Sequence, residues 1–148
     1  MLFISFCISL IDQFSKSVVI HLLSDKYFLQ VVPKVIQFRL VKNTGAAFSL
    51  FNNATPILSF LSLIVSLALI YWIFQSKPFP LAKGLGLSFL LGGCIGNGLD
   101  RWRLGYVNDF IELLPIDFPI FNFADIAINI AVLCLLIETL NKRNIPLS

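Results

Sequence analysis

Half of the eight acidic residues in this chain lie in one short stretch, NDFIELLPIDFPIFNFAD at residues 108–125, which contains no lysine or arginine. Asp109 lies at its start and Asp125 at its end. If the chain folds back here, the two carboxylates meet, and because such a pair cannot readily ionise twice, it shares one proton. A shared proton lets an acid pair deprotonate a water while it protonates a carbonyl or a leaving amine. The stretch therefore predicts acid–base hydrolysis.

The same acids also have structural interpretations. Glu112 and Asp117 fit a solvated loop, so we expect them to be structural. Asp125 alone would suit the N-terminus of a helix, where backbone N–H groups and the helix dipole favour an anion. Asp109 is the reason to favour chemistry over capping, and the sequence does not decide which carboxylate holds the proton.

Two further groups of polar residues interrupt apolar sequence. Asp12 and Lys16 are one helical turn apart, so they can pair on one face, either as a structural ion pair or as part of a substrate site. In GNGLDR, Asn97 and Asp100 share a helix face. Together with Arg101 they either end a helix at the membrane interface, with Arg101 and Asp100 paired, or help to organise a site.

Other catalytic classes find little support in the sequence. His21 is the only histidine and has no serine or cysteine motif near it, and there is no HExxH zinc motif. The three cysteines, Cys7, Cys94 and Cys134, lie in apolar segments and form no CxxC or Cys/His cluster. We therefore expect neither a metal nor an organic cofactor.

The composition indicates which elements must position these residues. The chain has 148 residues, of which 57% are hydrophobic and 13% charged, and its mean hydropathy is +0.88. This is too apolar for an ordinary soluble domain and predicts an integral membrane protein. The net charge of +3 comes from scattered basic residues, which gives no indication of a nucleic-acid groove.

We predict a single domain over residues 1–148, an all-α bundle of four transmembrane helices with a small β element on one membrane face. The β element, at about 27–52, is rich in β-branched and aromatic residues. The first apolar segment has no basic start and no cleavage site, so we expect it to be retained. The predicted helices cover residues of about 2–23, 57–74, 81–99 and 124–140.

Five motifs together resemble those of the lipoprotein signal peptidases, the type II signal peptidases of bacteria. They occur in the family's order over nearly the whole chain: DQFSK (12–16), NTGAAF (43–48), GGCIGNGLDR (92–101), VNDFI (107–111) and FNFAD (121–125). The resemblance implies an intramembrane aspartyl endopeptidase that cleaves a prolipoprotein just before its diacylglyceryl-modified cysteine. We expect a monomer whose partners are the lipidated substrate and membrane lipid.

The resemblance also assigns residues and a location. Asp109 and Asp125 match the catalytic aspartates. The family would place the protein in the bacterial cytoplasmic (inner) membrane, with both termini cytoplasmic and the β element and active site near the extracytoplasmic face. The distribution of lysines and arginines points weakly to the opposite orientation. The residues that match substrate-binding or site-supporting positions are Asp12, Lys16, Asn43, Gly45, Asn97, Asp100, Arg101 and Asn122.

Two alternatives to a peptidase are compatible with some of these residues. A small ion- or proton-coupled transporter would also need carboxylates inside the membrane, although the chain shows no internal repeat of the kind that many transporters have. A catalytically inactive relative that binds lipoproteins would lack one aspartate of the pair, and both are present.

Overall fold

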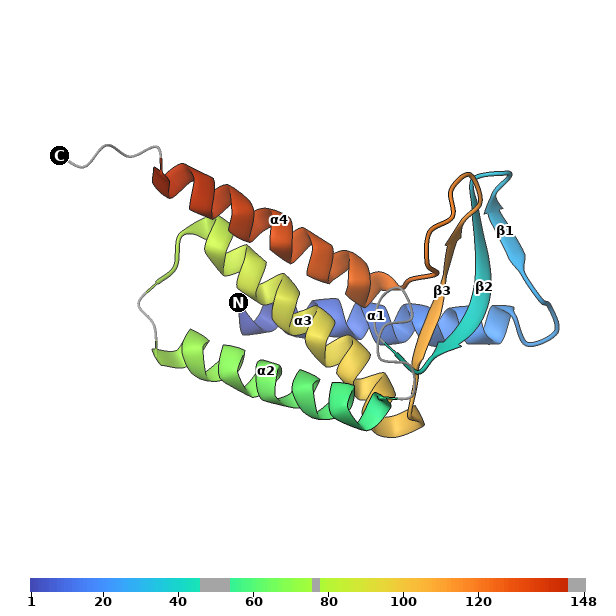
Figure 1. Ribbon diagram of the computed structural model, residues 1–148, viewed down its shortest axis with the longest axis horizontal. Coiled ribbons are helices and arrows are strands. Elements are labelled where there is room, and N and C mark those ends of the chain that lie inside the picture. Colours follow the sequence, from blue (N-terminus) through green and yellow to red (C-terminus); the bar gives the residue numbers. More distant parts are fainter. Residues whose placement is uncertain (46–53, 76–77, 144–148) are drawn as a thin grey trace.

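The computed structural model describes residues 1–45, 54–75 and 78–143. Four helices form a bundle, and a three-stranded antiparallel sheet lies at one end of it (Figure 1). Residues 46–52 of the predicted β element, and with them the end of the NTGAAF motif, lie outside the described residues. The helices are α1 (Leu2–Leu22), α2 (Thr55–Gln75), α3 (Leu81–Leu104) and α4 (Phe123–Arg143), and the strands are β1 (Leu29–Val32), β2 (Ile36–Asn43) and β3 (Val107–Leu113).

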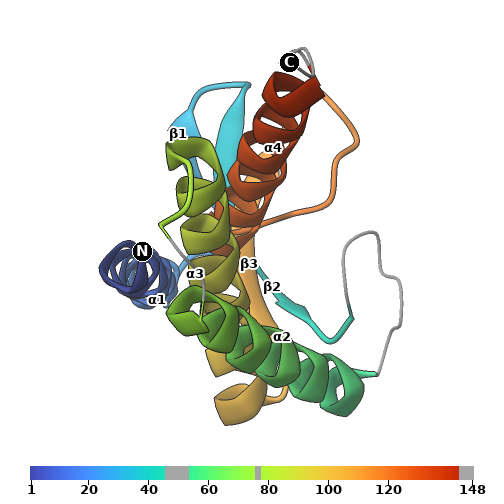
Figure 2. The ribbon, with the colours of Figure 1, turned by 90° about the vertical axis from the view of Figure 1, so that its left-hand side faces the viewer.

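The central helix of the bundle is α3. It packs against α1, α2 and α4, which lie around it when the bundle is viewed from its end (Figure 2). A Cβ atom at Gly92 would lie 2.7 Å from the Cβ of Ile8 in α1, and one at Gly93 would lie 2.7 Å from the backbone oxygen of Ala124 in α4. Only a residue without a side chain allows helices to approach this closely. The glycines of α3 therefore set the spacing of the bundle.

Three helices have the length and composition of membrane spans, namely Leu2–Leu22, Thr55–Gln75 and Phe123–Asn141. The fourth, α3, is less apolar because it carries many glycines as well as Asn97 and Asp100. A helix enclosed by three others exposes little surface to lipid, so its sequence can be less apolar than theirs. The predicted helical bundle with a small sheet is confirmed, and three of its helices have the composition of a span.

The end of α3 lies beyond the predicted boundary near residue 99. The helix continues to Leu104 and stops at Gly105, whose φ of 79° is left-handed, a backbone conformation that glycine adopts without a Cβ penalty. Asn97, Asp100 and Arg101 therefore lie inside the helix rather than at its end.

The chain after α3 forms a strand and not the loop predicted from the sequence. β3 pairs antiparallel with β2, and Val41 lies opposite Asp109. Residues 107–111 are all buried, so the strand has no solvent-facing side to give an alternating pattern. It also contains an asparagine and an aspartate, residue types that are uncommon in strands. Because β2 is distant in sequence, only the tertiary structure shows that the two strands pair.

Glu112 consequently lies in β3 rather than in a solvated loop. Arg39 of β2 donates two hydrogen bonds to its carboxylate, 2.8 Å from Nε and 2.6 Å from Nη2. Gln37 adds a third, of 2.6 Å. The hydrogen bonds from Arg39 are the main reason why the pKa of Glu112 is lowered. Asp117 is exposed in the segment between β3 and α4.

A hydrophobic cluster fixes the sheet to the first helix. Val19 of α1 packs with Phe110 and Ile111 of β3, and Phe110 is fully buried. Phe110 also meets Phe38 of β2 edge to face, with ring centroids 5.4 Å apart. Full burial of side chains of this size stabilises a fold by about 1.5–3 kcal/mol each. Because Phe110 directly follows Asp109, the cluster also fixes the position of that aspartate.

Candidate active site

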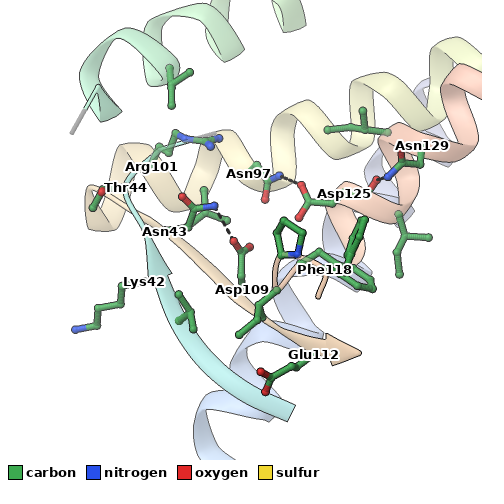
Figure 3. Close-up of a pocket in the computed structure, with 18 of the residues that line it drawn as sticks. Lys42, Asn43, Thr44, Asn97, Arg101, Asp109, Glu112, Phe118, Asp125 and Asn129 are labelled. Carbon is green, nitrogen blue, oxygen red and sulfur yellow. Dashed lines mark hydrogen bonds between the residues drawn. The ribbon is translucent and has the colours of Figure 1, made fainter. Parts of the chain in front are cut away.

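Asp109 and Asp125 line the same cavity (Figure 3). The cavity has a volume of about 1500 Å³ and lies between the sheet and helices α2, α3 and α4. One wall is apolar, with Leu58, Leu61 and Val65 of α2 among its residues. The other polar side chains that line the cavity are Arg39, Lys42, Asn43, Thr44, Ser62, Asn97, Arg101, Glu112, Asp117 and Asn129.

Asp109 is held on β3 by two neutral amides. Its Oδ1 accepts a hydrogen bond of 2.6 Å from Nδ2 of Asn122, and its Oδ2 accepts one of 2.8 Å from Nδ2 of Asn43. The side chain is buried, and this burial is the main reason why its pKa is raised to about 6. The negative charge of Asp125 adds to the rise, while the two amide hydrogen bonds oppose it. A proton on Asp109 is therefore available near neutral pH.

Asp125 lies in the first turn of α4 and forms a reciprocal capping pair with Asn122. Oδ1 of Asn122 accepts from the backbone N–H of Asp125 at 3.0 Å, and Oδ2 of Asp125 accepts from the backbone N–H of Asn122 at 3.1 Å. Its second oxygen, Oδ1, accepts 2.9 Å from Nδ2 of Asn97. The capping role considered from the sequence is therefore real, and it points the carboxylate of Asp125 toward the cavity (Figure 3).

Asn122 is the side chain that joins the two aspartates. It is fully buried, and its Nδ2 donates both to Asp109, at 2.6 Å, and to Oδ1 of Asn97, at 3.0 Å. Its backbone N–H meanwhile donates to Asp125. One residue thus contacts both carboxylates, which places them on neighbouring sides of the same cavity.

A buried ionic cluster lies behind these residues. Lys16 donates 2.7 Å to Oδ2 of Asp12, as the helical spacing predicted, and its Nζ also lies 3.2 Å from Oδ2 of Asp100. A third contact, of 3.1 Å, goes to Oδ1 of Asn97. All four side chains are at least nine-tenths buried. Lys16 therefore connects the ionic cluster to Asn97, which in turn donates to Asp125.

Arg101 does not form the interfacial pair with Asp100 that one interpretation of the sequence suggested. Its Nη2 donates 2.9 Å to the backbone oxygen of Gly45, and its buried Nε has no hydrogen-bond partner among the described residues. Asn43 also holds this segment, because its Oδ1 accepts 2.9 Å from the N–H of Gly45. Asn43 and Arg101 both line the cavity near the sheet, and both hold Gly45 next to it.

The structure brings the ten predicted site residues into one connected region, and it adds Gln13. Gln13 follows Asp12 on α1, and its Nε2 lies within hydrogen-bond distance of Asp12, Asp100 and the backbone oxygen of Gly96. In the sequence, Gln13 was marked only by its polar side chain in an apolar segment and by its place in the DQFSK motif. Within residues 1–45, 54–75 and 78–143, no group of three or more His, Cys, Asp or Glu side chains is arranged to hold a metal ion.

Comparison with solved structures defines the class of protein. A bacterial membrane enzyme determined by the in meso method at 2.3 Å resolution superposes with a TM-score of 0.84 and 28% identity, covering 99% of this chain and 93% of that one. A second bacterial membrane enzyme structure, at 1.9 Å, gives a TM-score of 0.80, also at 28% identity, over 93% and 90% of the two chains. The fold is that of a bacterial membrane enzyme with two aspartates facing its cavity.

Sequence comparison identifies the family. The profile of Signal peptidase (SPase) II matches residues 4–141. The lipoprotein signal peptidase of Parasynechococcus marenigrum (strain WH8102) is 49% identical over 134 residues, covering 90% of this chain and 84% of that protein. The lipoprotein signal peptidase of Synechococcus sp. (strain RCC307) is 45% identical over 135 residues, covering 90% of this chain and 89% of that protein. This chain belongs to the signal peptidase II family and is therefore a membrane-embedded protease, so the transporter alternative is set aside.

Proposed function

We propose that this protein removes the signal peptide from diacylglyceryl-modified prolipoproteins by cleaving the bond before the lipidated cysteine. Asp109 and Asp125 would activate the attacking water. The observation that carries the proposal is that both carboxylates line one cavity and are joined through Asn122. The names of the relatives from Parasynechococcus marenigrum and Synechococcus support the substrate class.

The proposed reaction divides the acid and base roles between the two carboxylates. Asp125, as the base, takes a proton from water while the water oxygen bonds to the scissile carbonyl carbon. Asp109, whose pKa is raised to about 6 and which is therefore protonated more readily than an ordinary aspartate, gives its proton to the carbonyl oxygen. Collapse of the tetrahedral intermediate breaks the C–N bond, and the leaving nitrogen receives the proton held by Asp125. As the C=O bond re-forms, a hydroxyl of the intermediate returns its proton to Asp109. The pair then shares one proton again.

The shape of the cavity suits a substrate with a lipid and a peptide part. The apolar residues of α2 at its wall would contact acyl chains. Asn43 and Arg101, which line the cavity near the sheet, and Gly45, which they hold, would contact the peptide backbone. The buried Nε of Arg101, unpaired among the described residues, is a donor that a substrate carbonyl would satisfy. The remaining predicted residues, Asp12, Lys16, Asn97, Asp100 and Asn122, would support the pair.

We further propose that all four helices cross the cytoplasmic membrane of the bacterium, as a single domain and as a monomer. The start of α1 and the end of α4 lie toward the end of the bundle that is remote from the sheet (Figure 1), which supports the placement of both helix ends on one side, the cytoplasmic side. The sheet and the aspartates would then face the extracytoplasmic surface. α3 would cross without the apolarity of the other helices because they enclose it.

The test is cleavage of a diacylglyceryl-modified prolipoprotein by the purified protein in detergent. Asp109→Asn and Asp125→Asn should each abolish cleavage while the lipidated substrate still binds. The matched control is Asp25→Asn, which removes an exposed carboxylate between α1 and β1 and should leave the rate unchanged. Cleavage that survives either active-site substitution in a correctly folded protein would refute the proposed roles.

A further inference from the structure

Two backbone N–H groups beside the aspartate pair are bound by the buried ionic cluster. The N–H of Asn108 donates 2.9 Å to Oδ2 of Asp100, and the N–H of Ala124 donates 2.9 Å to Oδ1 of Asp12. Asn108 directly precedes Asp109, and Ala124 directly precedes Asp125. Each aspartate of the proposed catalytic pair therefore has the preceding residue anchored by a different buried carboxylate.

The two anchoring carboxylates are themselves tied together by Lys16 and Gln13. Nζ of Lys16 lies 2.7 Å from Asp12 and 3.2 Å from Asp100. Nε2 of Gln13 lies 3.2 Å from Oδ2 of Asp12 and 2.8 Å from Oδ1 of Asp100. Gln13 also donates 3.1 Å to the backbone oxygen of Gly96, which joins α1 directly to the backbone of α3.

The chemistry of these contacts makes the arrangement stiff. Charge-assisted hydrogen bonds are shorter and stronger than neutral ones, and inside the bundle they do not compete with water. The peptide unit is planar, and consecutive Cα atoms are separated by a fixed distance of about 3.8 Å. Fixing the N–H groups of Asn108 and Ala124 therefore holds the peptide planes that end at the Cα atoms of these two residues. The Cα atoms of Asp109 and Asp125 lie one such fixed distance further along the chain, so their positions are restrained as well.

We propose that Lys16 and Gln13 are positioning residues that set the distance between Asp109 and Asp125, because they hold together the two carboxylates that anchor the backbone before each aspartate. The inference rests on the proposed function of that pair. Lys16 supplies the charge that compensates Asp12 and Asp100, and Gln13 supplies neutral, directional contacts to the same two groups. Gln13 is the better position for a test, because its replacement leaves the charge balance of the cluster intact.

The test replaces Gln13 by methionine, which has a similar unbranched shape and no N–H group. Because a displacement of about 1 Å can reduce a rate a hundredfold, we expect Gln13→Met to lower kcat by about tenfold to a hundredfold. KM should stay within about twofold of the parent value, since Gln13 does not line the cavity. In hydrogen–deuterium exchange without substrate, peptides that contain Asn108 and Ala124 should exchange faster than in the parent.

The control for a general loss of stability is Leu87→Ala, which opens a hole in the cluster of Leu69, Leu87 and Leu91, away from the aspartates. It should keep the kcat of the folded protein and the parent exchange rates at Asn108 and Ala124. The inference is overturned if Gln13→Met keeps kcat and exchange at parent values, or if it changes them no more than Leu87→Ala does.

Exchange needs no substrate, so it separates this inference from the proposed function. If Asp109→Asn and Asp125→Asn left cleavage intact, the proposed function of the pair would be wrong. The proposal that Gln13 and Lys16 position the pair for catalysis would then also be wrong, whatever the exchange rates. If those variants were inactive but Gln13→Met behaved as the parent, only the positioning roles would be wrong. Inactive aspartate variants, a lowered kcat and faster exchange at both anchors would support both.

Discussion

Four aspartates lie at the centre of this bundle, and they form two pairs with different partners. Asp12 and Asp100 share the ammonium of Lys16, whereas Asp109 and Asp125 accept hydrogen bonds from asparagine amides. An ammonium compensates a buried negative charge, but a neutral amide orients a carboxylate without compensating it. The first pair is suited to holding the fold, and the second is suited to exchanging protons. The same side chain thus acquires a structural or a chemical role from its neighbours.

The largest effect on activity is expected for a substitution in the second pair, and it should come without a loss of stability. Asp125→Asn should reduce the cleavage rate by about 10²–10⁴-fold, the usual contribution of an acid–base group. The melting temperature should change little, because an asparagine can still accept from the backbone N–H of Asn122. Kinetics with the lipidated substrate and thermal unfolding in detergent measure the two quantities. A variant that unfolds as its activity disappears would contradict the distinction.

The second prediction concerns the charge of the ionic cluster. Lys16→Met leaves Asp12 and Asp100 buried without their cation, and breaking a buried ion pair on one side costs about 3–5 kcal/mol. The free energy of unfolding should fall by this order, measured by denaturation in mixed micelles. Lys26→Met, which removes an exposed lysine after α1, is the control and should leave it nearly unchanged. A Lys16→Met protein of parent stability would show that the cluster does not hold the fold.

The third prediction concerns the amides that hold the proposed catalytic pair. The hydrogen bond from Asn43 lowers the pKa of Asp109, so Asn43→Ala should raise that pKa above about 6. If Asp109 is the proton donor, activity lost as the pH rises should then be lost at a higher pH than in the parent, with a change in maximal rate below about tenfold. Asn129→Ala is the matched control, because its amide donates to the backbone oxygen of Asp125 and to neither carboxylate. If Asn43→Ala instead lost its activity at a lower pH than the parent, the assignment of Asp109 as the proton donor would be wrong.

The smallest effect on stability is expected for the ion pair of Glu112 with Arg39, which lies apart from the four central aspartates. Arg39 and Glu112 form a bidentate pair, but Arg39 is 33% exposed. Solvated pairs of this kind contribute about 0–1 kcal/mol, so Arg39→Met should change the free energy of unfolding by less than about 1 kcal/mol. Thermal unfolding at low and high salt would measure it. A loss of unfolding free energy as large as that expected for Lys16→Met would show that this partly exposed pair contributes as much to stability as the buried ionic cluster does.

The helices could be predicted from the sequence because the signals that define them are local. Apolar segments of sufficient length mark α1, α2 and α4, and the glycines mark α3 as a helix that others approach closely. The pairing of Asp12 with Lys16 also follows from the helical repeat alone. The motifs further allowed Asp109 and Asp125 to be selected as candidates.

Other features required contacts between distant parts of the chain. β3 was predicted as a loop because its buried residues give no alternating pattern, and its partner β2 lies on the other side of two helices in the sequence. The pairing of Glu112 with Arg39 depends on that register. Gln13 could not be recognised, because its partners on α3 appear only when the helices pack.

By itself, the sequence determined a membrane-embedded helical protein with two separated candidate aspartates, because hydropathy and helical spacing act over a few residues. The tertiary structure decided which carboxylates share a lysine and which meet amides. It also decided that the residues before Asp109 and Asp125 are anchored by Asp100 and Asp12. These choices depend on how four helices and a sheet pack together, since the environment of a buried charge is made by whichever groups the fold places beside it.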